Sequence, residues 1–254
     1  MDQETLVLDG GALVGPDVVA VARKGLEVTI GNHSLELMEA SRATVEEATA
    51  SSTPTYGINT GLGALSTTPI STEQLALLQM NLLRSHAAGV GEPLPDEIVR
   101  GMMVILAASL CRGLSGVRTE IAKLLAGMLN ANVTPVIPSR GSVGASGDLA
   151  PLAHLALVLC GEGNAKLGEK VIPGKAAIAA SGLEPIVPTA KEGLALINGT
   201  HMMSSIATLA LADISVICEA AVIATAMSID AAKATDTFLD DRLHAARGQS
   251  GQQT

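Results

Sequence analysis

The residues of this chain that are best suited to take part in a chemical reaction lie in a glycine-rich loop, Gly141-Ser142-Val143-Gly144-Ala145-Ser146-Gly147-Asp148. Its triplet Ala145-Ser146-Gly147 places a glycine amide, the least hindered backbone nucleophile, directly after a serine and two residues after an alanine. If the loop is compressed, the amide nitrogen of Gly147 can attack the carbonyl carbon of Ala145. Loss of water from the resulting ring and from the serine side chain then gives an exocyclic methylidene, an electrophile made from the chain itself.

Three other interpretations of this loop compete with that chemistry. A phosphate-binding turn would use the same glycines at a helix N-terminus, but the spacing is G-x-x-G-x-x-G, no Walker lysine follows, and Asp148 would repel phosphate. A hydrolase nucleophile at Ser146 would need the pattern G-x-S-x-G, which the loop does not have. The third interpretation is a flexible loop that only begins a helix and is capped by Asp148. The spacing of the glycines is enough for it, so this interpretation is not excluded.

Tyr56 is the one tyrosine of the chain and begins the glycine-rich run Tyr56-Gly57-Ile58-Asn59-Thr60-Gly61-Leu62-Gly63. A loop of this composition can bring a phenol into a cleft without packing it. The hydroxyl can then act as an acid or a base, provided that surrounding dipoles or cations lower its pKa from about 10. A loop tyrosine that only packs against a neighbour is equally consistent with the local sequence.

His86 and Asn198 stand at the ends of predicted helices. His86 continues an apolar stripe, a pattern more typical of a core histidine, but two glycines follow it and leave room for a ligand. Asn198 precedes the longest predicted helix, where asparagine is among the best N-caps, and its amide is also suited to hydrogen bonding within a site. His86, His154 and His201 lack the helical spacing of zinc ligands, so no metal is expected.

The loop and the residues after it, from Gly141 through Leu155, resemble the signature of the histidine/phenylalanine/tyrosine ammonia-lyase family. The resemblance implies that Ala145-Ser146-Gly147 matures autocatalytically into a 4-methylideneimidazol-5-one (MIO) group, so that no external cofactor is needed. The run beginning at Tyr56 also resembles the family, which implies that Tyr56 is the base that removes the substrate β-proton. Asn198 matches the family asparagine that hydrogen-bonds the ring carbonyl of the electrophile.

The pair Ser85-His86 stands where the family selects the substrate ring, and it resembles the histidine-specific branch. The resemblance therefore implies a small amino-acid substrate, L-histidine, from which ammonia is eliminated without oxidation to give urocanate. Phenylalanine or tyrosine ammonia-lyase and aminomutase activities of the same family are alternatives. A second hypothesis, of a different class, is a catalytically incompetent helical fragment or assembly subunit that retains the motifs.

The resemblance runs over essentially all 254 residues, but the family's chains are about twice as long. Their second half supplies an arginine that grips the substrate carboxylate and a later glutamate, and neither segment is present here. Each active site of the family is assembled from several subunits of a homotetramer. The resemblance therefore implies the N-terminal half of an ammonia-lyase, which forms a homo-oligomer and needs the missing half for activity.

Composition agrees with a helical fold. Hydrophobic residues make up 48% of the chain but aromatic residues only 1%, so the core must be aliphatic and rich in alanine, which favours closely packed helices over a sheet sandwich. The formal net charge of −9, without a basic block, argues against nucleic acid and an anionic membrane surface as partners.

Three features bear on the compartment. Cys111, Cys160 and Cys218 are far apart in apolar helical runs, which predicts buried, reduced thiols rather than disulfides. The first residues are acidic and precede no apolar segment, so no signal peptide is expected. Three acidic residues interrupt the long apolar run near the C-terminus, and no basic flank anchors it, which argues against a membrane span. We expect a cytoplasmic protein without membrane contact.

The elements that must position these residues are mainly α-helices, in an ammonia-lyase-like helical bundle with a small mixed N-terminal region. Residues 1–135 are expected to form a mostly helical part with the Tyr56 loop, and residues 136–254 the electrophile loop and the first part of the central bundle. Strands are expected only before residue 35 and between residues 160 and 190, with a hairpin around residues 171–174. Apolar periodicity and capping residues predict helices over residues 16–23, 34–50, 72–88, 95–113, 117–128, 149–160 and 199–235.

Overall fold

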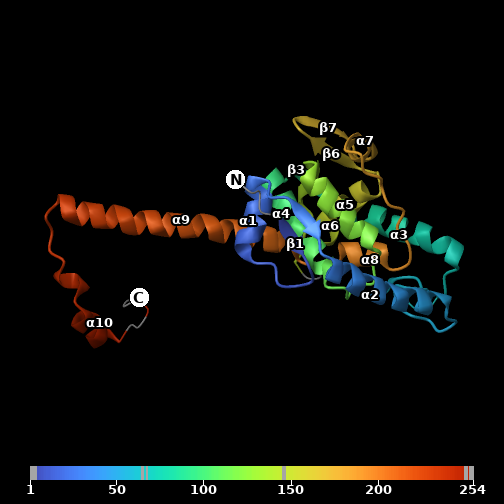
Figure 1. The fold of residues 1–254 in the computed structure, drawn as a ribbon, viewed down its shortest axis with the longest axis horizontal. Helices are drawn as coiled ribbons and strands as arrows, with labels where there is room; N and C mark the ends of the chain where they lie inside the picture. Colours follow the sequence, from blue (N-terminus) through green and yellow to red (C-terminus); the bar gives the residue numbers. More distant parts are fainter. Residues whose placement is uncertain (1–4, 64–65, 67, 145–146, 249–250, 252–254) are drawn as a thin grey trace. The chain divides into compact units, whose positions relative to one another are not determined.

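The computed structural model describes residues 5–63, 66, 68–144, 147–248 and 251 (Figure 1). The chain divides into two compact units, Met1–Leu209 and Ala210–Thr254. The sequence-based division at residue 135 stays a prediction, and both of its parts contribute to the first unit.

Helices dominate the described chain, which confirms the predicted mainly α fold (Figure 1). They are α1 Gly15–Lys24, α2 Asn32–Ala50, α3 Thr72–His86, α4 Asp96–Cys111, α5 Thr119–Asn130, α6 Leu149–Leu159, α7 Gly174–Ala180, α8 Glu192–Ile197, α9 His201–Ala231, α10 Asp241–Arg247 and the short 3-10 helix η2 Thr237–Leu239.

The ends of the first helices follow from local sequence signals. Helix α1 carries a proline and Asp17 in its first turn, where a missing amide hydrogen is tolerated and a negative charge is favoured. It ends at Gly25, which adopts the left-handed conformation typical of a helix C-cap. Helix α4 starts directly after Pro95, with Asp96 and Glu97 in its first turn. These are the signals by which the sequence predicts both helices.

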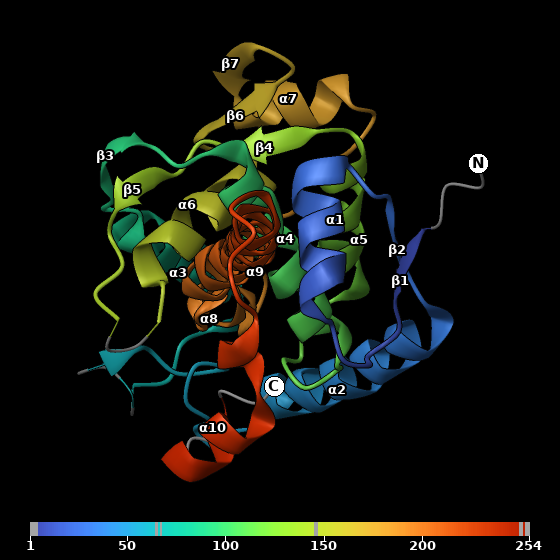
Figure 2. The same cartoon turned by 90° about the vertical axis from the view of Figure 1, so that its left-hand side faces the viewer.

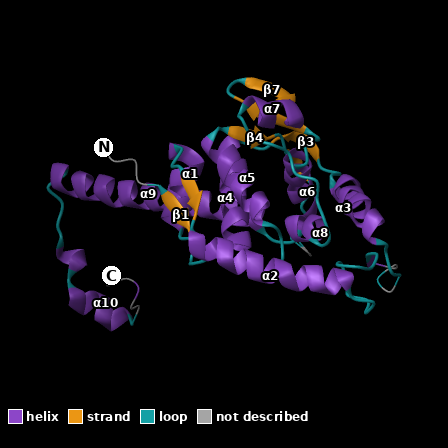
Figure 3. Ribbon diagram, turned by 45° about the vertical axis from the view of Figure 1, so that its right-hand side comes forward, coloured by secondary structure: helices purple, strands orange, loops and turns teal. Residues whose placement is uncertain are grey.

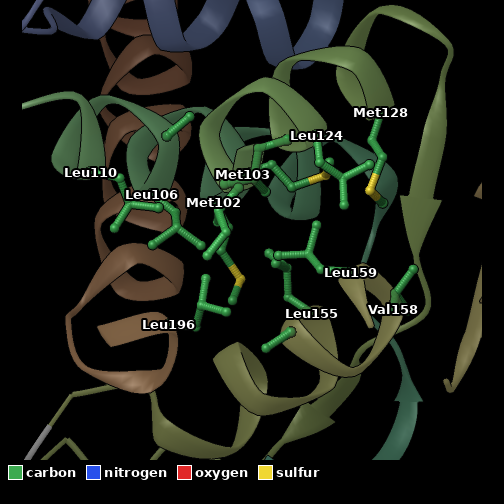
Figure 4. Packing of buried hydrophobic residues seen from close by; sticks show 14 of the residues in the cluster. Met102, Met103, Leu106, Leu110, Leu124, Met128, Leu155, Val158, Leu159 and Leu196 are labelled. Carbon is green, nitrogen blue, oxygen red and sulfur yellow. The ribbon is translucent and has the colours of Figure 1, made fainter. Parts of the chain in front are cut away.

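The core of the first unit is centred on α4, which packs against α1, α5 and α2 (Figure 2). Figure 4 shows leucine and methionine side chains of α4, α5, α6 and α8 that point into one common space. Met102 and Met103 of α4 and Leu155 of α6 are fully buried there. Each such side chain contributes about 1.5–3 kcal/mol through the apolar surface it removes from water. The aliphatic core predicted from composition is therefore present.

A second group of helices positions the candidate site. Helices α3, α6 and α8 all pack against one another, and α5 joins α6 to the core around α4. The three predicted site segments at the end of α3, before α6 and after α8 are therefore attached to mutually packed helices.

The described strands form three small sheets, which lie at the margins of the helical body (Figure 3). They are the parallel pair β1 Leu6–Leu8 and β2 Val28–Ile30, the antiparallel pair β3 Val90–Pro93 and β5 Pro138–Arg140, and the antiparallel sheet of β4 Val133–Pro135, β6 Asn164–Leu167 and β7 Lys170–Pro173.

The expectation that strands occur only before residue 35 and between residues 160 and 190 is wrong, because β3, β4 and β5 lie outside those ranges. Each of these three strands contains a proline, which argues against a central strand. All three lie at sheet edges, where a missing amide hydrogen does not interrupt a ladder. The predicted hairpin exists as β6 and β7, but its turn lies at residues 168–169, and residues 174–180 form the unpredicted helix α7.

Helix α9 confirms the long C-terminal helix predicted from the absence of proline and glycine. Its first residues belong to the first unit and bury His201, Met202, Ser205 and Leu209. By length and composition it is the one helix among the described residues that is apolar enough to cross a membrane, although a core helix of a soluble protein has the same properties. The absence of membrane contact therefore stays a prediction.

The second unit holds the rest of α9 and the short helix α10. The Asp240 carboxylate accepts a hydrogen bond from the backbone amide of Arg242 and so caps α10. Along this part of α9 the exposed apolar side chains are Leu211, Ile214, Val216, Ile217, Val222, Ile223 and Met227.

The cysteines differ in environment more than the sequence predicts. Cys111 is buried, and burial raises the pKa of its thiol to about 11. Cys160 is half-buried, and burial raises the pKa of its thiol to about 12. Cys218 is exposed on α9, so the prediction of a buried thiol is wrong at that position in the described chain. The helical run around Cys218 is apolar, but apolar periodicity does not tell which partner covers it.

Candidate active site

The electrophile loop joins β5 to α6, and the structure describes it at residues 141–144 and at Gly147 and Asp148. Ala145 and Ser146 lie outside the described residues. Gly147 has a φ of +87° and forms a parallel bridge with Gly199, so close that a Cβ at residue 147 would overlap the Gly199 carbonyl group. Only glycine combines this conformation with this approach. The last residue of the triplet is therefore attached to the backbone segment that follows α8.

Asp148 strengthens the same attachment. Its amide donates to the Gly199 carbonyl oxygen (2.7 Å), and its fully buried carboxylate accepts from the amides of Met202 (2.8 Å) and Met203 (3.0 Å). One interpretation left open by the sequence has Asp148 cap the helix that follows it, but α6 has no side-chain cap and Asp148 caps α9 instead. The free amides and the dipole at the start of α9 stabilise the carboxylate.

Asn198 follows the last turn of α8, and its side-chain amide donates to the Leu194 carbonyl oxygen at 2.7 Å. Because Asp148 binds the first amides of α9, Asn198 does not fill the alternative role of N-cap for that helix. The Asn198 side chain is exposed, next to the Gly199 backbone that contacts the electrophile loop. Asn198 thus directly precedes the residue that binds Gly147 and Asp148.

His201 begins α9 and packs directly against Gly199, so that a Cβ at residue 199 would overlap its imidazole ring. Gly199 also has a φ of +148°, which side chains disfavour. Burial lowers the pKa of His201, while the nearby Asp148 carboxylate raises it, and burial prevails. The buried imidazole is therefore neutral at pH 7 and packs against Gly199.

Tyr56 lies in the loop that follows α2, and the residue is 56% exposed. The buried side chain of Asn59 holds this loop: its oxygen accepts from the Thr55 amide (2.7 Å), and its amide donates to the Ala48, Ser51 and Thr53 carbonyl oxygens. The loop lies on α8, because a Cβ at Gly57 would come 2.5 Å from Leu194. Tyr56 is therefore presented by a loop that contacts the same short helix that carries Asn198.

Ser85 and His86 end helix α3 and share one hydrogen-bonded network. The Ser85 hydroxyl donates to the Leu82 carbonyl oxygen (2.9 Å), and His86 Nδ1 lies 2.9 Å from that oxygen and 3.1 Å from the Ser85 hydroxyl. Because a carbonyl oxygen can only accept, these partners assign the hydrogen of a neutral His86 to Nδ1. Its Nε2 atom is then a hydrogen-bond acceptor.

The turn after His86 lies beside the start of the electrophile loop. Strand β3 pairs with β5, and a Cβ at Gly141 would come 3.2 Å from the Cα of Gly89. The amide of Gly89 donates to His154 Nε2 of α6 at 3.1 Å, which requires an unprotonated Nε2. Burial lowers the pKa of His154 and so favours that form. The structure thus joins the segment after Ser85-His86 to the helix that follows the loop.

These contacts make Gly147 sensitive to any added side chain. We expect Gly147→Ala to lower the free energy of unfolding by about 1–2 kcal/mol for the positive φ and by about 1–3 kcal/mol more for the clash with Gly199. Gly144→Ala is the matched control, because Gly144 also has a positive φ (+71°) but no atom of the described residues within 4 Å of the added Cβ. Chemical denaturation of the two variants measures the difference, and equal destabilisation would contradict the contact with Gly199.

Comparison with known proteins identifies the family of the chain. The family model described as aromatic amino acid lyase matches residues 13–254. The chain belongs to the aromatic amino acid lyase family. The histidine ammonia-lyase of Gloeobacter violaceus is 49% identical over 249 residues, which cover 98% of this chain and 48% of the relative.

Solved structures of other proteins share the fold. The histidine ammonia-lyase of Trypanosoma cruzi matches with a TM-score of 0.90 at 38% identity, over 98% of this chain and 48% of its own. The phenylalanine aminomutase of Pantoea agglomerans also matches with a TM-score of 0.90, at 28% identity and over the same shares of both chains. The chain spans about half the length of the curated relatives it matches.

The structure adds residues that the sequence alone does not single out. Asn59 organises the Tyr56 loop, and the buried Gln79 accepts a hydrogen bond from the Leu194 amide of α8 (3.2 Å). The fully buried Glu192 begins α8. The only sequence signal for these three residues is that each is a polar residue within an apolar or glycine-rich run. That signal does not identify their hydrogen-bond partners. The roles of the predicted site residues themselves stay predictions.

Proposed function

We propose that this chain carries the electrophile, base and ring-selecting parts of a histidine ammonia-lyase, which eliminates ammonia from L-histidine to give urocanate. The observation that carries the proposal is the attachment of Gly147 and Asp148 to Gly199, which joins the last residue of the proposed Ala145-Ser146-Gly147 electrophile to the residue that follows Asn198. The identity to histidine ammonia-lyases supports the choice of reaction. The motifs Tyr56, Ala145-Ser146-Gly147 and Asn198 are all intact, which favours an enzyme over an incompetent assembly subunit.

The MIO group proposed to form from the triplet fits the residues around it. The close approach of Gly147 to Gly199 leaves no room for a side chain and holds one end of the triplet. When formed, the group supplies an electrophile that takes up the substrate amine and turns it into a better leaving group. Asn198, next to Gly199, is proposed to hydrogen-bond the ring carbonyl. No external cofactor or metal enters the proposal.

Tyr56 is the proposed base for the β-proton of the substrate. Its exposed phenol stands on a loop organised by Asn59, so it can approach a substrate without leaving a packed core. The ordinary pKa of a tyrosine is about 10, so the complete site must favour the phenolate. The parts of the site that would do this, together with the grip on the substrate carboxylate, are proposed to come from the missing half.

His86 is the proposed residue for recognition of the substrate ring. With its hydrogen on Nδ1, its Nε2 atom can accept a hydrogen bond from an imidazole N–H of histidine, which a phenyl ring cannot donate. A buried hydrogen bond left unmade costs about 1–3 kcal/mol, so this contact alone favours histidine over phenylalanine by about tenfold to a hundredfold. Ser85 contributes by accepting from the Nδ1 hydrogen and so keeps the ring in this form.

The exposed apolar side chains of α9 suit a homo-oligomer. An apolar surface of this extent on a helix is covered by other protein in a stable assembly. We propose that α9 takes part in a homotetramer, in which several subunits build each active site.

Substrate choice is tested on the complete enzyme by following urocanate, cinnamate and coumarate by ultraviolet absorbance. We expect fastest turnover with L-histidine and a loss of its preference over phenylalanine by about tenfold to a hundredfold in His86→Leu. Faster release of cinnamate or coumarate by the unaltered enzyme would assign the phenylalanine or tyrosine activity instead. Full histidine preference in His86→Leu would remove His86 from ring recognition.

A further inference from the structure

Glu192 is a buried carboxylate that the proposed chemistry does not use. Its side chain has no exposed surface, and it stands at the first position of α8. One oxygen accepts from the amide (3.1 Å) and Nε (2.8 Å) of Arg118, and the other accepts from Nη2 of Arg118 (2.8 Å) and the Thr189 amide (2.8 Å). Both oxygens are therefore held by donors in a two-pronged ion pair.

The surroundings of Glu192 stabilise the negative charge of its carboxylate. Burial raises the pKa of the carboxyl, but hydrogen bonds from the Arg118 side chain and from the Thr189 and Arg118 amides outweigh burial, so the pKa lies below its ordinary value. The Arg42 guanidinium adds a second positive charge 3.9 Å away. A buried ion pair of this kind is costly to break, because the remaining charges lose their partner but stay partly buried.

The two arginines also bind the segment that leads into α8. Arg118 donates to the Val187 carbonyl oxygen (2.8 Å), and Arg42 donates to the Ala190 carbonyl oxygen (3.1 Å) and the Thr189 hydroxyl (3.2 Å). Because Arg42 belongs to α2 and Arg118 lies just before α5, the segment is fastened to two other elements of the core.

Lys191, between this segment and Glu192, has a φ of +69°. Side chains disfavour that conformation, so it persists only where its surroundings impose it. Its neighbours on both sides are the residues held by the arginines, Ala190 and Glu192. The ion cluster therefore sets where α8 begins, against the intrinsic preference of the backbone.

The other end of α8 belongs to the candidate site. Asn198 follows Glu192 by six residues, roughly 9 Å along a helix, so Glu192 does not reach the reacting atoms. Gly199 forms the bridge to Gly147, and Leu194 in the middle of the helix contacts the Tyr56 loop at Gly57. Any shift of this short helix along its axis thus moves Asn198 and Gly199 relative to the electrophile loop.

We propose that Glu192 is a positioning residue, whose buried ion cluster with Arg118 and Arg42 fixes α8 along its axis and thereby seats Asn198 against the electrophile loop. This inference rests on the proposed function, because it assigns a role in the same reaction. It predicts that the effect of Glu192 on turnover passes through Asn198.

The test is Glu192→Gln in the complete enzyme, alone and combined with Asn198→Ala. Glutamine keeps the size of the side chain, but it replaces one acceptor with a donor that faces the Arg118 donors. We expect kcat with L-histidine to fall by about a hundredfold with little change in KM, because a displacement of about 1 Å at a reacting group costs that much. In the Asn198→Ala background the same change is expected to alter kcat by less than about twofold, since residues that act through one another are not additive.

Two further variants keep the test decisive. Arg118→Lys retains the charge of the cluster but loses the two-pronged geometry, so it is expected to lower kcat as Glu192→Gln does. This loss of kcat is also expected to disappear in the Asn198→Ala background. The variant therefore tests the proposal even if Glu192→Gln does not fold. Glu97→Gln is the matched control, because it breaks an ion pair with Arg23 (2.6 Å) that is partly exposed and remote in sequence from α8. It is expected to leave kcat unchanged.

Intact mass gives a readout that does not depend on turnover. Formation of the MIO group removes two water molecules from the chain, and we expect the same converted fraction in Glu192→Gln as in Glu97→Gln, because the effect of Glu192 on turnover passes through Asn198. Unchanged kcat in both cluster variants, or equal losses with and without Asn198, would overturn the positioning role. If the unaltered enzyme itself shows neither the water loss nor ammonia release, the proposed function fails instead, so the two failures are distinguishable.

Discussion

Replacing Ser146 by alanine is expected to abolish ammonia release by the complete enzyme, with a loss of several orders of magnitude. The serine side chain supplies the carbon that becomes the methylidene, and alanine cannot lose water to form it. Without the electrophile, the substrate ammonium remains a poor leaving group. Turnover of L-histidine and the absorbance of the methylidene ring measure the effect, and both are expected to be absent.

Ser142→Ala is the control for this experiment, because Ser142 lies in the same loop but outside the triplet. We expect it to retain the ring and most of the activity. Unchanged turnover in Ser146→Ala would eliminate the MIO mechanism, and an equal loss in both variants would show that the loop is sensitive to any substitution.

Replacing Tyr56 by phenylalanine is the second change with a large expected effect. The phenol is half exposed, so removal of its hydroxyl should leave the fold intact while it removes the base for the β-proton. General-base catalysis typically contributes about 10²–10⁴-fold, and we expect kcat to fall within that range. Intact mass should still show complete loss of two waters, because ring formation does not involve Tyr56.

Asn59→Ala provides the contrasting variant, because the Asn59 side chain makes the hydrogen bonds that hold the Tyr56 loop. It is expected to disturb the loop as a whole, with a lower unfolding midpoint as well as lower activity. If Tyr56→Phe instead loses ring formation and activity together, or lowers the unfolding midpoint as Asn59→Ala does, Tyr56 is a residue of the fold and not the base.

The helices are the part of the fold that sequence predicts well, because their signals are local. Apolar periodicity, Pro95 with the acidic residues after it, and the uninterrupted run of α9 each indicate a helix without reference to distant residues. Strands β3 and β5 carry no such signal, since they pair across more than forty residues and contain prolines. Their register is a property of the packed chain.

In the candidate site too, local features can be predicted from the sequence and long-range contacts cannot. Local motifs nominate Tyr56, His86, Ala145-Ser146-Gly147 and Asn198 one by one, but no local signal tells which segments meet. The carboxylate of Asp148 caps a helix that begins more than fifty residues later, whereas the sequence predicts a cap on the helix beside it. The two arginine partners of Glu192 come from segments more than seventy residues earlier.

The central claim is that Ala145-Ser146-Gly147 becomes an electrophile, and the most direct test is the mass of the purified, unaltered chain. Peptide mapping by mass spectrometry around residues 141–149 reports the same event at its position. The account predicts a chain lighter than its sequence by two water molecules, with the whole loss in the peptide that contains the triplet. If the complete enzyme releases ammonia from L-histidine while its chain has the mass of the unmodified sequence, the claim is contradicted.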